Sequence, residues 1–598
     1  MYRSPWAAPI SRRRMLATTG AGMSGVLAAA LIGCSAGNKT PAAAPAGPSA
    51  ATKAAPVSDK PKSGGTIKYA LGSDLESLDP TIYRGTNTST HQANVYSQLF
   101  VFETGDGKPS SGKVVGDLAA TCELPDPTTL IVHLNPKAKF DQREPLNGRV
   151  VNAEDVVQTW KRVAANATLA PNISNARNKE APVVAIEAVD PSTVRIKLAR
   201  PDALLMPILA TNLNVIPAEG ASGKIDLTKE MRGTGPFVLE RYQRSVAIEF
   251  KRNPTWHGGP DRPYVDGIKV SLVPDRAQME VQFRSKNLHF GAVSAENIPQ
   301  FARDLKDSEI AVGAPNHRSG NFGPSYAPGQ PWHDVRVRRA VSMSMDRDKF
   351  AEVLFNPKDY DALGVKLTVR WNAPFAGGYG AFWIDPKGKD FGPSAQWLKH
   401  NVAEAKKLLE AAGYTAQKPL EFDMVYPGVY YGRDWPTRVD TFLSMAAETG
   451  AIKFKHASID YTKYIAGYWR GGAKFDGVNQ KNGVQFPPGG AAASTALEWL
   501  ISYFTPKGVS TATADAWPEV EKMLTKLRTV SDFEGAKAGV HEVQRYVVEN
   551  MIVVPVGPLT QTTDLVWDKL HGYGEIQGWP GGKAGVSEYF DFWMEEQI

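Results

Sequence analysis

The sequence predicts an α/β protein of more than one domain, and three observations lead to that class. The chain has 598 residues, more than one hydrophobic core usually holds. Runs such as 64–71 and 268–272 alternate apolar and polar side chains with the period of a half-buried strand. Residues 402–412 instead carry apolar side chains at helical spacing behind a capping asparagine, Asn401.

The first 33 residues predict an export signal. Arg12, Arg13 and Arg14 resemble a twin-arginine motif, and an uncharged run rich in alanine and glycine follows them. That run ends in Leu31-Ile-Gly-Cys34, which resembles a bacterial lipobox, so cleavage before Cys34 and lipidation of its thiol are implied. A run of small residues that ends in cysteine by chance is the alternative. The run is too short and too weakly apolar for a spanning helix.

Residues 34–63 predict a disordered tether, because they are rich in Ala, Pro, Ser and Lys and lack aromatic residues and leucine. The second cysteine, Cys122, could in principle form a disulfide with Cys34. If Cys34 is lipidated, Cys122 is left as a small packed apolar residue.

Charge argues against a nucleic-acid partner. The formal net charge is +6, but four arginines and no acidic residue lie in residues 1–33. The remainder therefore carries 64 of the 68 basic residues against 62 acidic ones. Without a basic stripe, a nearly neutral body is not typical of nucleic-acid binding.

The first part of the body reads as strands, turns and one capped helix. Residues 64–71 predict a strand, and Leu78-Asp79-Pro80 predicts a turn. Residues 95–100 are expected to lead out of a helix, and residues 130–134 to form a strand. Asn152 is a predicted N-cap, followed by a helix with an apolar stripe that packs. Residues 190–198 predict a turn that feeds a strand.

The stretch 232–273 predicts a glycine-rich entry, a hairpin and a returning strand. Gly233 and Gly235 give the backbone freedom for a close approach, and Pro236 fixes the exit. Residues 238–242 and 247–251 are two half-apolar runs of one hairpin. On residue types alone this is a structural β-meander, because it holds no nucleophile, base or metal set.

The second part of the body reads as capped helices. Asp346 is predicted to begin a helix with Phe350, Val353 and Leu354 on one face. The helix after Asn401 stops at a glycine. Residues 540–549 predict a helix, and 552–556 a strand that returns to the first lobe.

Several of these patterns occur together in one known family. The order Gly233-Thr-Gly-Pro-Phe237, Arg252-Asn253 and Asp266-Gly-Ile268 resembles the core of the solute-binding proteins of ABC importers. The class concerned serves peptides, nickel and oligosaccharides (family 5, dipeptide/oligopeptide-binding-protein-like). Residues 332–341 also resemble this family, and the resemblance implies that Asp334 caps a helix. The ending 405–414 resembles it too, so the resemblance spans roughly 64–574.

The resemblance implies a two-lobed periplasmic-binding-protein-like (type II) α/β fold with an extra subdomain inserted in lobe I. The expected segments are a signal peptide (1–33), the lipidated cysteine and linker (34–63), lobe I part a (64–106), the inserted subdomain (107–231), lobe I part b (232–312), lobe II (313–544) and the return to lobe I (545–598).

It also implies a function without catalysis, metal or cofactor. We expect a lipid-anchored monomer on the outer face of the cytoplasmic membrane, extracellular or periplasmic, that captures a mid-sized solute and delivers it to an ABC permease and ATPase. A sensor partner and a secreted enzyme are the alternatives. The chain has no Gly-x-Ser-x-Gly elbow, phosphate loop or dinucleotide fingerprint, and its ten histidines are scattered.

Aromatic and amide residues in loops are the candidate ligand contacts, because flat rings stack sugars and amides bind hydroxyls. For each tryptophan, packing in the core is the alternative. No acidic residue follows Asp476 in its loop, and a ligand ammonium buried without a carboxylate is costly, so an oligosaccharide is preferred over an oligopeptide. The candidates are Tyr83, Phe322, Trp371, Tyr431, Trp435, Trp469, Asn479 and Gln480.

Overall fold

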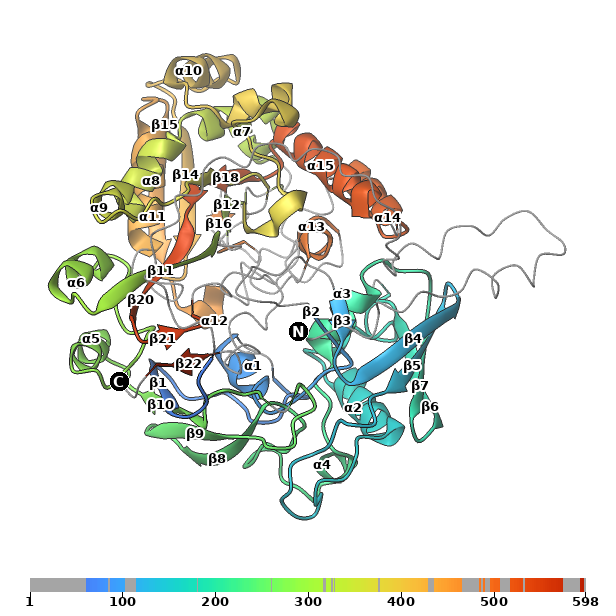
Figure 1. The fold of residues 1–598 in the computed structure, drawn as a ribbon. Coiled ribbons are helices and arrows are strands. Elements are labelled where there is room, and N and C mark those ends of the chain that lie inside the picture. The colour runs from blue at the N-terminus through green and yellow to red at the C-terminus, as the bar shows by residue number, and fades with distance from the viewer. Residues whose placement is uncertain are drawn as a thin grey trace, which may run out of the picture.

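The computed structural model shows helices and sheets arranged in two lobes, one above the other in Figure 1. It describes residues 61–83, 86–102, 114–179, 181–259, 261–315, 319–323, 326, 329–374, 377–428, 435–464, 483–485, 488–489, 495–505, 517–530, 533–573 and 592–595. The predicted export signal, Cys34 and nearly all of the predicted tether lie outside these residues.

Lobe I is built on a four-stranded sheet with the order β1-β10-β9-β8. Its strands are β1 (Thr66–Leu71), β8 (Phe237–Gln243), β9 (Ala247–Arg252) and β10 (Gly267–Leu272). The predicted hairpin is confirmed as the antiparallel pair β8–β9. Strand β1 pairs in parallel with β10, starting at Thr66↔Gly267, so segments about two hundred residues apart lie side by side. Ile268 and Val270 are buried while Lys269 is exposed, as the alternation predicts.

The two glycines of the central stretch sit against backbone, as predicted. A Cβ on Gly233 would lie 2.0 Å from the carbonyl oxygen of Val95. The N–H of Gly235 donates to that same oxygen at 2.7 Å. Any side chain at these positions would separate the stretch from the segment after α1 (Thr86–Gln92).

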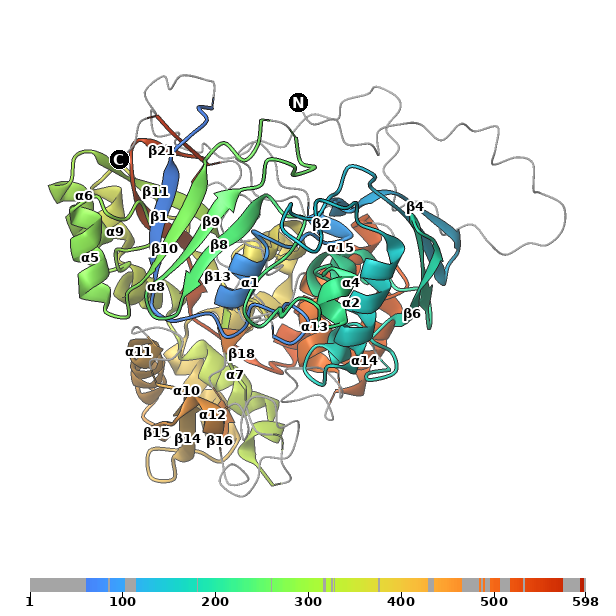
Figure 2. The same ribbon diagram turned by 90° about the horizontal axis from the view of Figure 1, so that it is seen from below.

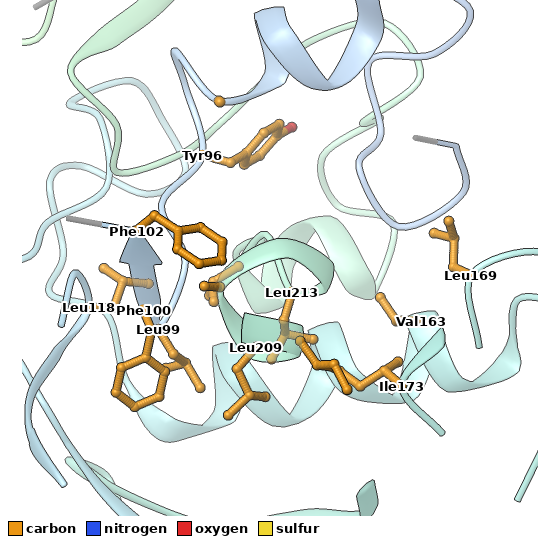
Figure 3. Packing of buried hydrophobic residues seen from close by; sticks show 14 of the residues in the cluster. Tyr96, Leu99, Phe100, Phe102, Leu118, Val163, Leu169, Ile173, Leu209 and Leu213 are labelled. Atoms are coloured by element: carbon orange, nitrogen blue, oxygen red, sulfur yellow. The ribbon is translucent and has the colours of Figure 1, made fainter. Parts of the chain in front are cut away.

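The inserted subdomain is an antiparallel sheet with the order β4-β5-β7-β6, packed on helix α2. Its elements are β3 (Val114–Gly116), β4 (Ala119–Asp126), β5 (Thr129–Leu134), α2 (Ala153–Ala165), η2 (Ala170–Asn172), β6 (Val183–Asp190), β7 (Thr193–Leu198), α3 (Leu205–Asn212) and α4 (Ala218–Ala221). Strand β2 (Phe100–Phe102) of lobe I pairs with β3. Figure 3 shows the core beside it, where Leu99 and Phe100 lie near Leu209 and Leu213.

Helix α2 is anchored at both ends by charged groups. Asn152 caps it in a reciprocal capping box with Asp155, which confirms the predicted N-cap. Asp155 is fully buried and pairs with Arg149 at 2.7 Å. Near the other end Arg162 pairs with the buried Asp79, which ties the helix to the predicted Leu78-Asp79-Pro80 turn.

Cys122 lies on β4, half-buried against the core. Burial raises the pKa of its thiol to about 11. Cys122 therefore packs against the core, as the sequence predicts.

Lobe II contains a parallel sheet with the order β15-β14-β16. The side chains of Asp334, Asp346 and Asn401 accept hydrogen bonds from the first turns of α7, α8 and α10, which confirms these three predicted caps. The elements here are η3 (Pro331–His333), α7 (Val335–Met343), α8 (Arg347–Phe355), α9 (Pro357–Asp361), η4 (Gly377–Phe382), η5 (Lys389–Phe391), η6 (Pro393–Leu398), α10 (Val402–Ala411), β14 (Leu420–Tyr426), α11 (Trp435–Ala447), β15 (Ile452–Ser458), α12 (Tyr461–Tyr464) and β16 (Gly483–Gln485).

The C-terminal third returns to both lobes. Arg528, which caps α14, lies 3.6 Å from Asp202, so this part of the expected lobe II contacts the inserted subdomain. The elements of this third are β17 (Pro488–Gly489), α13 (Ala496–Phe504), α14 (Pro518–Leu527), α15 (Phe533–Glu549), β18 (Val554–Val556), β19 (Pro558–Leu559), β21 (Leu570–His571) and β22 (Trp593–Met594). Two short strands earlier in the chain, β12 (Ser319–Phe322) and β13 (Arg370–Trp371), pair with β18 and β19, respectively.

Residues 552–556 do not return to the first lobe, contrary to the prediction. Strand β18 pairs with β12, and Val554 and Val556 are buried in the same cluster as Phe322 and Trp332. A buried strand in either lobe would have the apolar composition of this run. Its pairing partner could therefore not be predicted from its own residues.

Within the described residues, no helix has the length and apolar character needed to cross a membrane.

Candidate functional site

The two lobes are joined by a ribbon of two antiparallel strands, β11 (Ser308–Pro315) and β20 (Gln561–Trp567). The chain enters lobe II after β11 and comes back through β20. The ladder runs from Ser308↔Trp567 to Val312↔Thr563 and then shifts register before Pro315. A narrow ribbon between two packed lobes is the geometry of a hinge. Its position agrees with the crossing expected near 313 and puts the return crossing later than the expected 545.

One buried carboxylate fixes the ribbon to lobe I. Asp564 on β20 accepts hydrogen bonds from the backbone N–H of Gly291 at 2.9 Å and of Leu565 at 2.8 Å, and from the hydroxyl of Tyr573. Desolvation raises the pKa of Asp564 to about 6, although these hydrogen bonds oppose the shift. The carboxylate therefore holds one end of the hinge in place.

A second contact reaches across from lobe II. Tyr360 on α9 is buried among residues of α5 (Arg276–Arg284), α6 (Ile298–Asp304) and β20. Its hydroxyl donates to the carbonyl of Ala295 at 3.1 Å and lies 3.2 Å from Oγ1 of Thr563. Figure 1 and Figure 2 both show α9 beside α6. The outer side of the hinge is thus closed by direct packing between the lobes.

The inner side of lobe I presents an unusual helix, α1, which has no apolar residue. Its sequence is TNTSTHQ, yet Thr88, Ser89, His91 and Gln92 are buried. Both views place α1 between the lobe I sheet and α2 (Figure 1 and Figure 2). A helix that is polar all round is not held by hydrophobic packing of its own, so its side chains must find polar partners.

Those partners are partly on the strand below. The hydroxyl of Tyr69 on β1 lies 2.7 Å from Nε2 of His91. The side-chain amide of Gln92 donates to the carbonyl of Ser77 at 3.2 Å, and Thr88 hydrogen-bonds Glu76. Helix α1 therefore forms a buried polar layer in lobe I that can orient neutral hydrogen-bonding groups.

Of the predicted contact residues, Tyr83 lies just before this helix. Its side chain is 39% exposed, and the neighbouring Ile82 is 44% exposed. Two adjacent exposed apolar side chains at the start of a polar layer fit a contact surface. The ligand role of Tyr83 stays a prediction. Tyr431, Trp469, Asn479 and Gln480 lie outside the described residues.

The other three predicted residues are core residues of lobe II. Phe322 is fully buried, 5.0 Å in ring-centroid distance from Trp332 and 5.5 Å from Phe442. Trp371 donates its indole N–H to Asp348 at 2.8 Å, and Trp435 at the start of α11 is 7% exposed. These surroundings match the packing alternative that the sequence left open, and a ligand role for the three stays a prediction.

The described residues contain no group of three or more histidine, cysteine or acidic side chains that could hold a metal ion. The sequence also gave no indication of Tyr360 or of the α1 layer. The polar run 86–92 is the one feature that could have pointed to the layer, since seven polar residues in a row are unusual for an enclosed helix.

Comparison with known proteins decides the family. Residues 113–497, more than half of the chain, match the family described as bacterial extracellular solute-binding proteins, family 5 Middle. The chain belongs to this family. Family 5 consists of binding proteins rather than enzymes, and membership confirms the resemblance found in the motifs.

Curated and solved relatives agree with this assignment. The periplasmic oligopeptide-binding protein OppA of Salmonella typhimurium is 25% identical over 384 residues, which are 60% of this chain and 65% of that relative. The match to this family 5 relative thus spans less than two thirds of its length.

Two solved structures show the same fold. The periplasmic binding protein DppA from Helicobacter pylori in complex with peptide STSA has a TM-score of 0.67 at 19% identity, covering 90% of this chain and 99% of that one. AgaA from A. tumefacien R10 in complex with agropinic acid has a TM-score of 0.68 at 19% identity, covering 89% and 99%. The predicted two-lobed α/β fold of family 5 is confirmed.

Proposed function

We propose that this chain captures a mid-sized solute between its lobes and delivers it to the permease and ATPase of an ABC importer. The family match, on a two-lobed fold joined by a two-stranded ribbon, is the observation that carries the proposal. Binding energy would close the lobes about β11 and β20, and the closed form would be recognised by the permease. The protein acts as a monomer, since one chain supplies both lobes.

A peptide-like solute is the better choice of ligand class. The oligosaccharide expectation rested on Trp435, Trp469, Asn479 and the lack of an acidic residue after Asp476. Of those three contacts Trp435 lies in the described residues, and it is packed in the core, as are the candidates Phe322 and Trp371. Curated relatives of the chain carry names such as oligopeptide-binding and dipeptide-binding protein. Agropinic acid in AgaA shows that other solutes are held by the same fold.

A free peptide needs a carboxylate for its α-ammonium group. Four acidic residues are buried in the described part of the chain, Asp79, Asp141, Asp155 and Asp564, and the buried side chain of Asp202 pairs with Arg200 and Arg528. The first three pair with Arg162, Arg143 and Arg149, respectively, and Asp564 is bound by Tyr573 and Gly291. The anchor is therefore sought in the loops around Asp434 and Asp476, which lie outside the described residues.

Calorimetry with a small panel tests the proposal. Trialanine should bind the wild-type protein, and N-acetyl-trialanine should not, because acetylation removes the charge that the carboxylate holds. At a hundredfold excess over its dissociation constant, a bound solute adds about 2.7 kcal/mol to the free energy of unfolding. Asp476→Asn and Asp434→Asn show which acid is the anchor. Binding of maltotriose without binding of trialanine would restore the oligosaccharide expectation.

The lipid anchor is tested separately. Cys34→Ser should abolish incorporation of radiolabelled palmitate when the full chain is produced in a bacterium, because the thiol that receives the lipid is gone. Cys122→Ser is the matched control and should be labelled like the wild type, since Cys122 is packed in β4. Equal labelling of the Cys34→Ser protein would rule out lipid anchoring at this cysteine, and with it the expected attachment to the outer face of the cytoplasmic membrane.

A further inference from the structure

Two buried carboxamides directly after α1 have no hydrogen-bond partner among the described residues. Asn94 and Gln98 are both 0% exposed, and neither the amide nitrogen nor the amide oxygen of either side chain hydrogen-bonds any described residue. The carboxamide oxygen of Asn214 and the hydroxyl of Thr234 are likewise buried without a partner among these residues. Buried polar atoms are almost always paired in folded proteins, so these four side chains require an explanation.

The four side chains come from segments that touch each other. Gln98 and Asn214 face each other in an antiparallel bridge, so their side chains project from the same side of the pair. Thr234 lies between two glycines, of which Gly235 donates its N–H to the carbonyl of Val95, next to Asn94. The segment 94–98 thus holds both carboxamides and contacts the segments that hold Asn214 and Thr234.

Apolar packing surrounds this polar set on one side. Leu99 and Leu213, the chain neighbours of Gln98 and Asn214, are fully buried in the core that Figure 3 shows. Leaving amide groups unpaired beside such a core costs free energy for each group. Both carboxamides of Asn94 and Gln98 would carry that cost in full, which indicates that a partner not among the described residues satisfies them.

The chemistry of the leftover atoms defines what that is. The nearby carboxylate of Asp117 is engaged, since one oxygen accepts from the N–H of Gln98 at 2.9 Å and the other lies 2.7 Å from Nε2 of His257. What is left over is amide N–H donors, amide oxygen acceptors and a hydroxyl, with no charge among them. Such a set suits a neutral ligand group that donates and accepts, and it does not suit an ammonium or a carboxylate.

We propose that Asn94, Gln98, Asn214 and Thr234 form a buried site for neutral hydroxyl or amide groups. The occupant is either ordered water or a neutral part of the captured solute. Internal water commonly bridges such groups, and that source is independent of the proposed transport function. The solute source rests on the proposed function.

The test combines crystals of the ligand-free full protein with two nearly isosteric variants, Gln98→Met and Asn94→Leu. Wild-type crystals report ordered density at the carboxamides. Melting of each variant without ligand, and calorimetry with trialanine, report whether the amides are used. Gln544→Met is the control: its buried side chain accepts from the N–H of Ile384 at 3.3 Å and donates to the carbonyl of Phe382 at 2.6 Å, so it should lower the melting temperature through protein bonds alone.

Each source has its own outcome. Water is identified by density within hydrogen-bonding distance of both amides in ligand-free crystals, with a lower melting temperature for both variants. The solute is identified by unchanged melting of the ligand-free variants and about tenfold weaker trialanine binding.

The proposal is overturned if ligand-free crystals show no density there and the variants melt at or above the wild-type temperature with unchanged trialanine affinity. An unpaired amide that serves no ligand should behave in that way, because its replacement by an apolar group removes a desolvation cost. If trialanine does not bind the wild type, the crystals and the melting data decide alone, and only the proposed ligand class fails.

Discussion

Trp435→Ala is expected to lower the free energy of unfolding by about 3–5 kcal/mol, the usual cost of truncating a buried tryptophan. Trp435 opens α11 with 7% of its surface exposed and shares a cluster with Val439, Phe442 and Leu443 of the same helix. Removal of the indole leaves a cavity that the packed lobe II core cannot close. Denaturant unfolding followed by tryptophan fluorescence and by circular dichroism measures the change.

The control is Trp435→Phe, which keeps an aromatic ring and should lose clearly less stability. Solute affinity of both variants, measured well below their melting temperatures, should equal that of the wild type. Loss of affinity by about 2 kcal/mol with an unchanged free energy of unfolding would show instead that Trp435 contacts the solute, as the sequence suggested.

Gly233→Ala should destabilise the protein by about 3 kcal/mol, because the new methyl group has no room. Its Cβ would lie 2.0 Å from the carbonyl oxygen of Val95 and 3.1 Å from the ring of Tyr96. The first of these is backbone, so the segment after α1 must move away from the lobe I stretch. Thermal unfolding compares the variant with the wild type.

Gly72→Ala is the matched control. Nothing lies within 4 Å of a Cβ at Gly72, so this substitution should leave stability unchanged or raise it slightly, because alanine lowers the conformational entropy of the unfolded chain. Equal effects of the two substitutions would mean that the close approach at Gly233 is not a feature of the folded protein.

Local signals account for most of what the sequence predicted correctly. The hairpin β8–β9 and the caps Asn152, Asp346 and Asn401 depend on residues within a few positions of each other. Propensity and periodicity act over that same range, so such elements can be read from one sequence. The parallel pairing of β1 with β10 joins distant segments, and no local pattern predicted it.

The wrong predictions have one physical cause: a local sequence pattern does not determine which other segment it packs against. Val353 was placed on one face of its helix with Phe350 and Leu354, but it is 53% exposed, because α8 packs through Phe350 and Ala351. Strand β18 has the composition of any buried strand and pairs in lobe II. An aromatic ring in a core and one in a binding site have the same composition, so Trp371 and Trp435 could not be assigned from sequence.

The polar layer on lobe I was missed for a related reason. A run of polar residues such as 86–92 is normally solvated, and only the fold shows that neighbouring elements enclose it. Tyr360 was missed because its hydroxyl meets Ala295 and Thr563, which are far away in the chain.

Small-angle X-ray scattering of the protein without its export signal tests the central claim most directly. The claim is that two lobes joined by β11 and β20 close around a solute. The radius of gyration should fall when the tightest-binding peptide of the calorimetric panel is added at saturation, because lobe closure brings mass toward the hinge. An unchanged radius of gyration with that peptide bound would contradict a hinge-bending receptor.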